Sequence, residues 1–177
     1  MSILMITIET ENYNLISQDF YDKTINSIDL SLIPCTCGHS GCLIRHGSYK
    51  RRIQLTDQIL TLTIIRVFCN VCGHTHALLL SSMVPYSQIP LMTQYDAVLA
   101  FEEHGDLSSV LTKHCFVDEN NLRSILRNYR HFWQQRLLSV SLLLSSLSSL
   151  VQECFSSFSR QFMQIKRTRN RLFILPT

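Results

Sequence analysis

The stretch PCTCGHSGCLIRHGSYKRR, residues 34–52, carries three cysteines, two histidines and four basic residues within nineteen positions. Twenty-seven residues after the last of these cysteines comes CNVCGH, residues 69–74, a C-x-x-C-G arrangement. Close pairs of cysteines on tight turns are typical of a zinc ribbon, because Zn²⁺ takes four tetrahedral ligands and thiolates suit it. We therefore expect the two segments to share one zinc ion.

The second segment offers one pair of cysteines, whereas the first offers two choices. Cys35 with Cys37 places Gly38 directly after the pair, as in the second segment, although C-x-C is tighter than the usual two-residue spacer. Cys37 with Cys42 is the alternative, and the sequence leaves it open. We prefer the first choice, with Cys42 as a small buried residue or a substitute ligand. The predicted zinc ligands are Cys35, Cys37, Cys69 and Cys72.

Between the cysteine pairs the sequence predicts a β-hairpin, with SYKRRIQL and ILTLTIIRVFC as strands joined through residues 56–58. Such a small sheet buries little, so zinc should supply much of its folding free energy, on the order of 10 kcal/mol. The zinc is expected to be structural. Only Asp57 is acidic between residues 35 and 90, and the motifs of catalytic zinc sites are absent, so we do not expect an enzyme.

Residues 85–136 show the apolar spacing of helices, with one from residue 91 to about 105, a second over about 107–114 and a third after 118. This outline predicts a trihelical helix-turn-helix whose last helix enters the major groove of DNA. Arg123, Arg127 and Arg130 fall at i, i+4 and i+7 and form a basic stripe on that helix.

The C-terminal residues 137–177 read as a Leu/Ser-rich helix followed by a basic tail. A heptad-like apolar seam from Tyr129 to Phe158 is compatible with a homodimer and equally with packing on the chain's own domain or on another protein. The expected fold class is therefore α+β and mostly helical. Its parts are an N-terminal segment of unknown role (1–33), a zinc-ribbon β-hairpin (34–84), the helix-turn-helix (85–136) and a long C-terminal helix (137–177).

The net charge of +3 is unevenly distributed, since residues 1–34 sum to −4, residues 35–90 to +4 and residues 91–177 to +3. This distribution fits a polyanionic partner, and we expect double-stranded DNA. The side chains expected to contact it are Arg45, Lys50, Arg51, Arg52, Lys113, Arg123, Arg127 and Arg130.

The chain shows neither a secretory leader pattern nor an apolar stretch long enough for a bilayer. Its most apolar run, residues 137–151, contains six serines and is shorter than the ~20 apolar residues that span a membrane. We expect a cytoplasmic protein without membrane contact, in which the seven cysteines are reduced or bind metal.

With these motifs in view, residues 34–135 resemble a family of bacterial zinc-binding proteins of unknown function associated with insertion sequences and transposases. The matching words are CTCGHSGC, RHGSYKR and RVFCNVCGHTHALLLSSMVPYSQI. The resemblance implies a zinc ribbon plus helix-turn-helix acting on transposon DNA beside a separately encoded transposase.

A complete transposase catalytic domain is excluded, because it needs three carboxylates that hold two metal ions. After Trp133 only forty-four residues remain, and Glu153 is their one acid. An accessory DNA-binding protein or the DNA-recognition portion of a transposase system is the preferred function. The alternative is a protein-interaction module that docks a transposase or acts as a transcriptional regulator.

Overall fold

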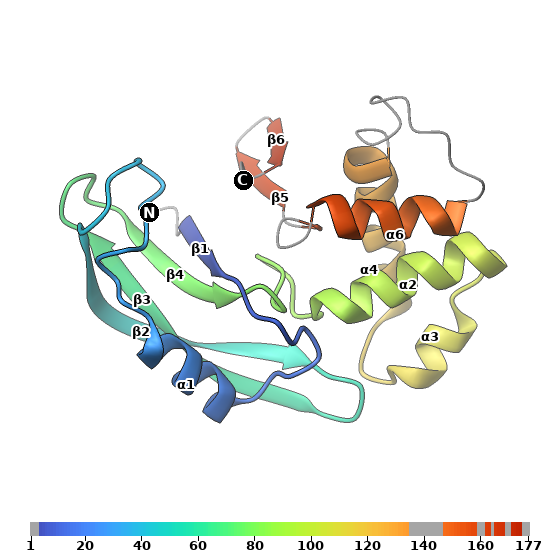
Figure 1. Cartoon of the computed structure of the whole chain (residues 1–177). Helices are drawn as coiled ribbons and strands as arrows, with labels where there is room; N and C mark the ends of the chain where they lie inside the picture. Colours follow the sequence, from blue (N-terminus) through green and yellow to red (C-terminus); the bar gives the residue numbers. More distant parts are fainter. Residues whose placement is uncertain (1–3, 135–146, 159–161, 164, 169–170, 175–177) are drawn as a thin grey trace. The chain divides into compact units, whose positions relative to one another are not determined.

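The computed structural model describes residues 4–134, 147–158, 162–163, 165–168 and 171–174 (Figure 1). The chain divides into two compact units. The first, here called the sheet unit, comprises Met1–Ile53 and Leu60–Ser82. The second, here called the helical unit, comprises Gln54–Ile59 and Met83–Thr177.

The sheet unit is built around a four-stranded sheet in the order β1-β4-β3-β2, with one helix, α1. The elements are β1 (Leu4–Ile8), α1 (Gln18–Ser27), β2 (Leu43–Gln54), β3 (Ile59–Cys69) and β4 (Thr75–Leu80). β1 runs parallel to β4, and β3 pairs antiparallel with the first half of β4. β2 and β3 are joined by a turn closed by Leu55 N–H donating to Gln58 O at 2.8 Å. Parallel neighbours need a long crossover, so this short connection makes β2 antiparallel to β3.

The expected fold class, α+β and mostly helical, is wrong. The chain is a mixed α/β protein, about 39% helical and 25% strand, with a four-stranded sheet where only a hairpin was expected. The two additional strands are β1 and β4. Residues 76–80 of β4 are all buried, so the strand is a continuous apolar run without the alternation that identifies a half-buried strand.

Helix α1 completes the sheet with its side chains. Tyr21 is fully buried, and its hydroxyl accepts the N–H of Ile65 at 2.8 Å and donates to Leu78 O at 3.0 Å. The side-chain amide oxygen of Gln18 accepts the N–H of Thr63 at 2.8 Å. β3 pairs with β4 over residues 66–68, so these two side chains bond the backbone N–H groups of Ile65 and Thr63 outside that ladder. The N-terminal segment, whose role the sequence did not indicate, is thus part of the sheet unit.

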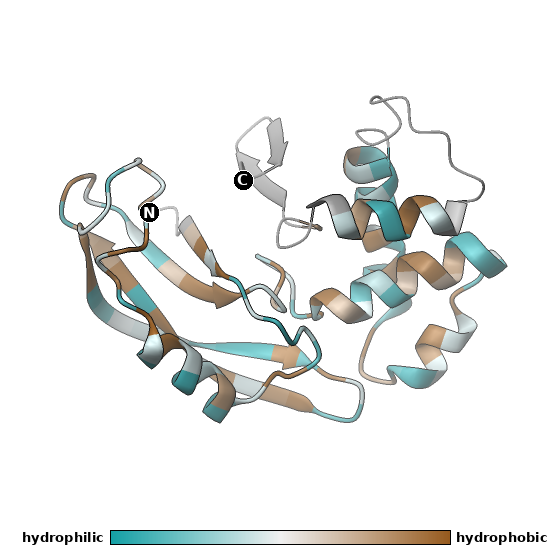
Figure 2. Ribbon diagram, viewed as in Figure 1, coloured by the Kyte–Doolittle hydropathy of each residue, from teal (hydrophilic) through white to brown (hydrophobic). Residues whose placement is uncertain are grey.

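The helical unit contains helices that pack around α2. Its elements are α2 (Leu91–His104), α3 (Ser108–Lys113), α4 (Glu119–Asn128), the π-helix η1 (Tyr129–Gln134), α6 (Leu147–Phe158), and the paired strands β5 (Ile165–Thr168) and β6 (Arg171–Ile174). α3, α4 and α6 all contact α2. Figure 2 shows both apolar and polar residues along α2. A cluster of aromatic rings holds this core together, namely Tyr95, Tyr129, Trp133, Phe155 and Phe162.

The expected trihelical helix-turn-helix is also wrong, and none is evident in the described part of the chain. α3 has only six residues, and α4 continues directly into η1. The buried residues of α4, Leu122, Ile125 and Leu126, belong to a core that also includes α6. The helices near the expected positions therefore pack as part of a larger helical unit and do not form a separate three-helix domain.

The expected long C-terminal helix falls partly outside the described residues, at 135–146. Its described part is α6, with twelve residues, and Leu150, Val151 and Cys154 on it are buried. The ring of Phe155 lies 4.8 Å from that of Tyr95 on α2. The described apolar face of α6 thus packs within the helical unit, and the homodimer stays a prediction. The expected basic tail contributes to β5 and β6, apart from residues 169–170, which are not described.

Candidate metal centre

The first of two cysteine-bearing turns, here called knuckle 1, is residues 35–39 in the loop between α1 and β2. Cys35 N–H donates to His39 O at 2.8 Å, and Gly38 N–H donates to Cys35 O at 2.9 Å. Gly38 has a φ of +89°, which favours glycine. These bonds fold the turn so that Cys35 is buried while Cys37 remains exposed.

The second turn, here called knuckle 2, is residues 69–74 and joins β3 to β4. Cys69 N–H donates to His74 O at 2.9 Å, and Gly73 N–H donates to Cys69 O at 3.0 Å. Gly73 has a φ of +70°. The N–H of Cys72 lies 3.4 Å from the Sγ of Cys69, so the backbone of the turn donates to a sulfur atom. Knuckle 2 therefore repeats the hydrogen bonds of knuckle 1 at the end of a strand.

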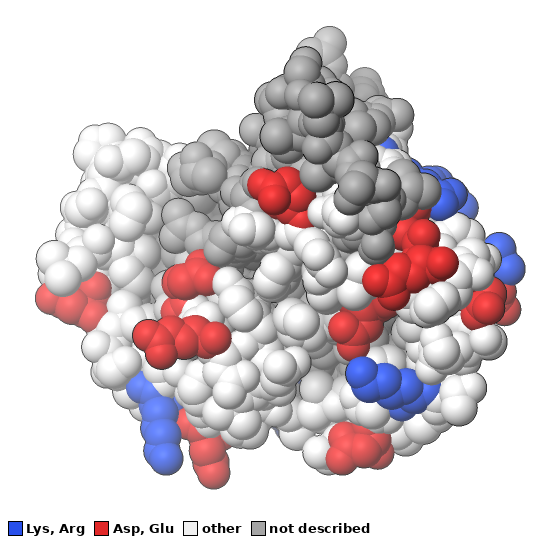
Figure 3. Space-filling view, turned by 45° about the vertical axis from the view of Figure 1, so that its right-hand side comes forward, with Lys and Arg blue, Asp and Glu red and all other residues white. Residues whose placement is uncertain are grey.

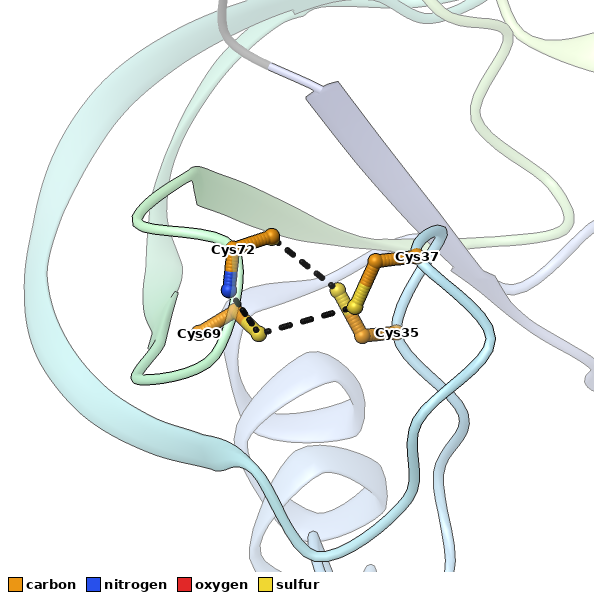
Figure 4. A group of neighbouring side chains, drawn as sticks. All are labelled: Cys35, Cys37, Cys69 and Cys72. Carbon is orange, nitrogen blue, oxygen red and sulfur yellow. Dashed lines mark hydrogen bonds between the residues drawn. The ribbon is translucent and has the colours of Figure 1, made fainter.

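The two knuckles face one another across four sulfur atoms (Figure 4). The Sγ atoms of Cys35, Cys37, Cys69 and Cys72 all lie within 4.8 Å of one another. Cys35 Sγ lies 3.7 Å from Cys72 Sγ, and Cys37 Sγ lies 3.9 Å from Cys69 Sγ. A tetrahedral site with Zn–S bonds of about 2.3 Å has sulfur atoms about 3.8 Å apart. The predicted proximity is confirmed, and the four cysteines lie close enough to hold a metal ion.

Cys42, the alternative ligand, lies outside this group of four. It is buried, and its Sγ lies 3.2 Å from His39 O, to which the thiol donates. Its own carbonyl oxygen accepts the N–H of Asn70 at 3.0 Å. Cys42 thus contacts knuckle 1 through its thiol and knuckle 2 through its backbone carbonyl.

The surroundings shift the acidity of the cysteines in opposite directions. Burial raises the pKa of Cys35 to about 12. Burial acts in the same direction on Cys69, but the N–H groups of Cys72 and Val71 and the neighbouring thiols stabilise its thiolate, and the pKa of Cys69 falls to about 6. Knuckle 2 therefore provides a sulfur that is prepared to carry the charge a metal ligand needs.

Two histidines contact the sulfur atoms from outside the group of four. His39 is exposed, with its Nδ1 at 3.6 Å from Cys37 Sγ. His76 on β4 is fully buried, with its Nε2 at 3.3 Å from Cys35 Sγ, and burial lowers the pKa of this imidazole. His46 lies beside Phe68, with ring centroids 5.5 Å apart, and His74 is exposed. The sequence analysis did not distinguish His76 from the other histidines. The available signal was the apolar run that follows His76, which indicates that this histidine is buried.

The predicted DNA contacts of the sheet unit lie on β2. Between His46 and Tyr49 the side chains of this strand do not alternate regularly between its two faces. His46 packs beside Phe68, and the Arg66 guanidinium lies over the Tyr49 ring at 4.8 Å. Residues 66 and 68 share one face of β3, whereas residues 46 and 49 of β2 share a face only if one extra residue intervenes. Gly47, with a φ of +128°, lies at this point.

This bulge places Arg45, Lys50 and Arg52 on one face of β2 and Arg51 on the other. Arg45, Lys50 and Arg52 are exposed, and Arg51 is half-buried. Arg45 donates to Asn26 Oδ1 of α1 at 2.9 Å. We call Arg45, Lys50 and Arg52 the β2 cations.

The predicted contacts of the helical unit are largely paired with acidic residues of the same unit. Lys113 Nζ lies 3.1 Å from Asp96 Oδ2, and Arg130 Nη2 lies 2.9 Å from Glu102 Oε1. Arg123 pairs with Glu119 one helical turn earlier, while Arg127 is exposed. Figure 3 shows acidic and basic side chains lying close together on the visible face. The structure therefore does not present these cations as a continuous basic stripe, and their role in DNA binding stays a prediction.

Among the described residues, no helix has both the length and the apolar character needed to cross a membrane. Comparison of the chain with protein-family models, curated proteins and solved structures gives no match.

Proposed function

We propose that this protein is a zinc-dependent DNA-binding protein, in which the metal fixes the two knuckles and the β2 cations contact the phosphate backbone. The observation that supports it most strongly is the set of four Sγ atoms within 4.8 Å of one another. A tetrahedral set of four sulfur donors is typical of zinc or iron–sulfur sites, and single-ion sites with two knuckles suit zinc.

The role proposed for the zinc is structural. Four thiolates fill the tetrahedral positions, whereas a catalytic zinc keeps one position for water or substrate. The zinc would hold knuckle 1, which belongs to no helix or strand, against knuckle 2 at the end of the sheet. β2, which begins directly after Cys42, would thereby keep a fixed place relative to α1 and β3.

The β2 cations are the preferred DNA contacts because none of the three forms an ion pair with an acid of the described residues. Residues 30–56 contain no acidic residue, and Arg45, Lys50 and Arg52 lie within this stretch. In the helical unit, by contrast, Lys113, Arg123 and Arg130 are paired with Asp or Glu. Affinity for DNA comes mainly from neutralised phosphates, so cations free of acidic partners contribute most.

The DNA that we propose as target is the end of an insertion sequence, with this chain acting beside a separately encoded transposase. This part of the proposal rests on the resemblance of residues 34–135 to the insertion-sequence-associated family.

The test is the salt dependence of binding to a labelled terminal-repeat duplex, followed by fluorescence anisotropy between about 25 and 200 mM salt. A triple variant, Arg45→Ala with Lys50→Ala and Arg52→Ala, should weaken binding strongly and lower the slope of log K against log salt by about three. The matched control is Arg123→Ala with Arg127→Ala and Arg130→Ala in the helical unit, which also removes three positive charges.

We expect the control to bind within a few-fold of the parent protein at each salt concentration. If the helical variant lost binding and the β2 variant retained it, the surface would be wrongly assigned. If the zinc-loaded parent protein failed to bind any duplex at the lowest salt, the proposed function would be wrong. A random duplex of the same length separates general DNA binding from recognition of the terminal repeat.

A further inference from the structure

His76 occupies a fixed position directly behind the cysteine site. It is the second residue of β4, the strand that follows knuckle 2, and it pairs with Leu4 of β1 on one side and Val67 of β3 on the other. Its side chain is fully buried. Because both neighbouring strands hold its backbone, the imidazole cannot move far without disturbing the centre of the sheet.

The two ring nitrogens of His76 have different surroundings. Nε2 lies 3.3 Å from the Sγ of Cys35, a hydrogen-bond distance for sulfur. Nδ1 is buried and has no hydrogen-bond partner among the described residues. The set of ligand atoms that lie within 4.8 Å of one another contains the four cysteines and not His76, so the imidazole stands outside the ligand group.

A neutral imidazole carries one N–H and one lone pair, so only one tautomer fits these surroundings. With the hydrogen on Nε2, the ring donates to Cys35 Sγ and leaves a bare lone pair at Nδ1. With the hydrogen on Nδ1, a buried N–H would have no acceptor while a lone pair faced a sulfur that carries negative charge, which is unfavourable at both nitrogens.

We propose that His76 is a positioning residue of the metal centre, whose Nε2–H donates to the Cys35 thiolate and holds it toward the metal. Donors of this kind orient ligands and stabilise their charge, and their loss commonly lowers metal affinity by about 10-fold to 100-fold. Cys35 is 3% exposed, so water gives its thiolate little support and a protein donor matters most there. The inference rests on the proposed zinc site and adds to it the group that supports the most buried part of knuckle 1.

The first test uses the unmodified full-length protein loaded with zinc. Long-range ¹H–¹⁵N correlation spectra of the histidine side chains report which ring nitrogen carries hydrogen. We expect His76 in the Nε2–H tautomer, with a proton that exchanges slowly with solvent. An Nδ1–H tautomer would overturn the proposal, because Nε2 would then be a zinc ligand or a bare lone pair. A protein that took up no zinc would instead contradict the proposed function itself.

The second test compares three variants loaded with Co²⁺, whose sulfur-to-metal charge-transfer band reports on the thiolates. His76→Leu removes the donor and should lower Co²⁺ affinity by about 10-fold to 100-fold and move the band to lower energy. His76→Gln retains an N–H at similar reach and should restore most of the affinity and band position. His74→Leu is the matched control, since His74 is an exposed histidine two residues earlier.

A structural role alone predicts that Leu and Gln at position 76 behave alike, because neither reproduces the ring. Equal affinity and an unchanged band for His76→Leu would overturn the proposal, as would a failure of His76→Gln to differ from it. If His76→Leu does not fold, the tautomer measured in the unmodified protein decides the question.

Discussion

The two knuckles share one backbone design but differ in length and in what surrounds them. In knuckle 1 the closing hydrogen bond joins Cys35 to His39, and in knuckle 2 it joins Cys69 to His74, so knuckle 1 has one residue fewer between the bonded groups. Both turns bond the N–H of a glycine with positive φ to the carbonyl oxygen of their first cysteine. The glycine and these two bonds therefore define the knuckle, and the spacer between its cysteines can vary.

The surroundings differ more than the backbone does. Knuckle 2 connects two paired strands, since Phe68 of β3 lies opposite Thr75 of β4. Knuckle 1 lies in a loop without regular structure between α1 and β2. The sheet thus fixes both ends of knuckle 2. We expect knuckle 1, by contrast, to depend on the metal, on Cys42 and on His76 to keep its place.

The largest expected effect is the loss of the metal itself. Cys69→Ser should abolish zinc binding, because it removes one of the four sulfur atoms that lie close enough to hold the ion. Cys42→Ser is the matched control, since Cys42 is also buried but lies outside the four-sulfur group. Zinc measured by elemental analysis should be one ion per chain in the control and none in Cys69→Ser.

The same measurement on Cys35→Ser decides between the two ligand choices in knuckle 1. We expect this variant to lose zinc as Cys69→Ser does. Retention of zinc in Cys35→Ser together with its loss in Cys42→Ser would show that Cys37 and Cys42 are the ligands. Knuckle 1 would then not be the counterpart of knuckle 2.

The second effect concerns which knuckle opens when the metal is removed. A hairpin alone would unfold on chelation, but the four-stranded sheet has its own core, with Leu62, Ile64 and Leu78 among its fully buried residues. We expect chelation to remove hydrogen-exchange protection from the Cys35 amide in knuckle 1 while the Cys69 amide keeps much of its protection. Protection in α2 should not change, which makes the helical unit an internal control. Equal loss of hydrogen-exchange protection in both knuckles would show that the sheet does not hold knuckle 2 in place without the metal.

The third effect is a pH dependence of the metal-free, reduced sheet unit. The pKa of Cys69 is lowered from 9.0 to about 6, so its thiolate contributes stability that is present above pH 9 and is lost as the pH falls through about 6. The pKa of Cys35 is raised from 9.0 to about 12, so its contribution is present below pH 9 and is lost as the pH rises toward 12. Urea unfolding should show the difference between parent and Cys69→Ala growing from pH 6 to 9, and the difference between parent and Cys35→Ala shrinking above 9. Parallel curves at all pH values would contradict this assignment.

The cluster of four cysteines could be predicted from the sequence because each knuckle is local. Two cysteines and a glycine within a few residues specify a turn, and the pairing of the two turns follows from the four ligands that zinc requires. The choice of Cys35 over Cys42 depended on the matching glycines, Gly38 and Gly73, and the structure brings that set together. His76 could not be distinguished, because its contact with Cys35 depends on where β4 lies in the sheet.

The fold was harder to predict, since β1 and β4 form a pair of strands about seventy residues apart in the chain. Two ion pairs, one local and one between different helices, involve arginines of the predicted stripe. The pairing of Arg123 with Glu119 is an i, i+4 pair that the sequence already contained. The pairing of Arg130 with Glu102, on a different helix, could not be read from local sequence.

The smallest expected effect tests whether the shorter spacer strains knuckle 1. A Cβ at Gly38 or Gly73 would meet no atom within 4 Å, so replacement by alanine costs only backbone energy, about 1–2 kcal/mol in the left-handed region. Gly38 has a φ of +89° and Gly73 a φ of +70°, and the left-handed minimum for other residues lies near about +57°. Gly38→Ala should therefore lower the free energy of unfolding of the zinc-loaded protein more than Gly73→Ala does, as measured in urea. Asparagine tolerates this region better, so Gly73→Asn should cost less than Gly73→Ala. Equal costs for the two alanine variants would mean that the missing residue is absorbed elsewhere in the loop and that the two turns are equally relaxed, and a larger cost at Gly73 would contradict the prediction.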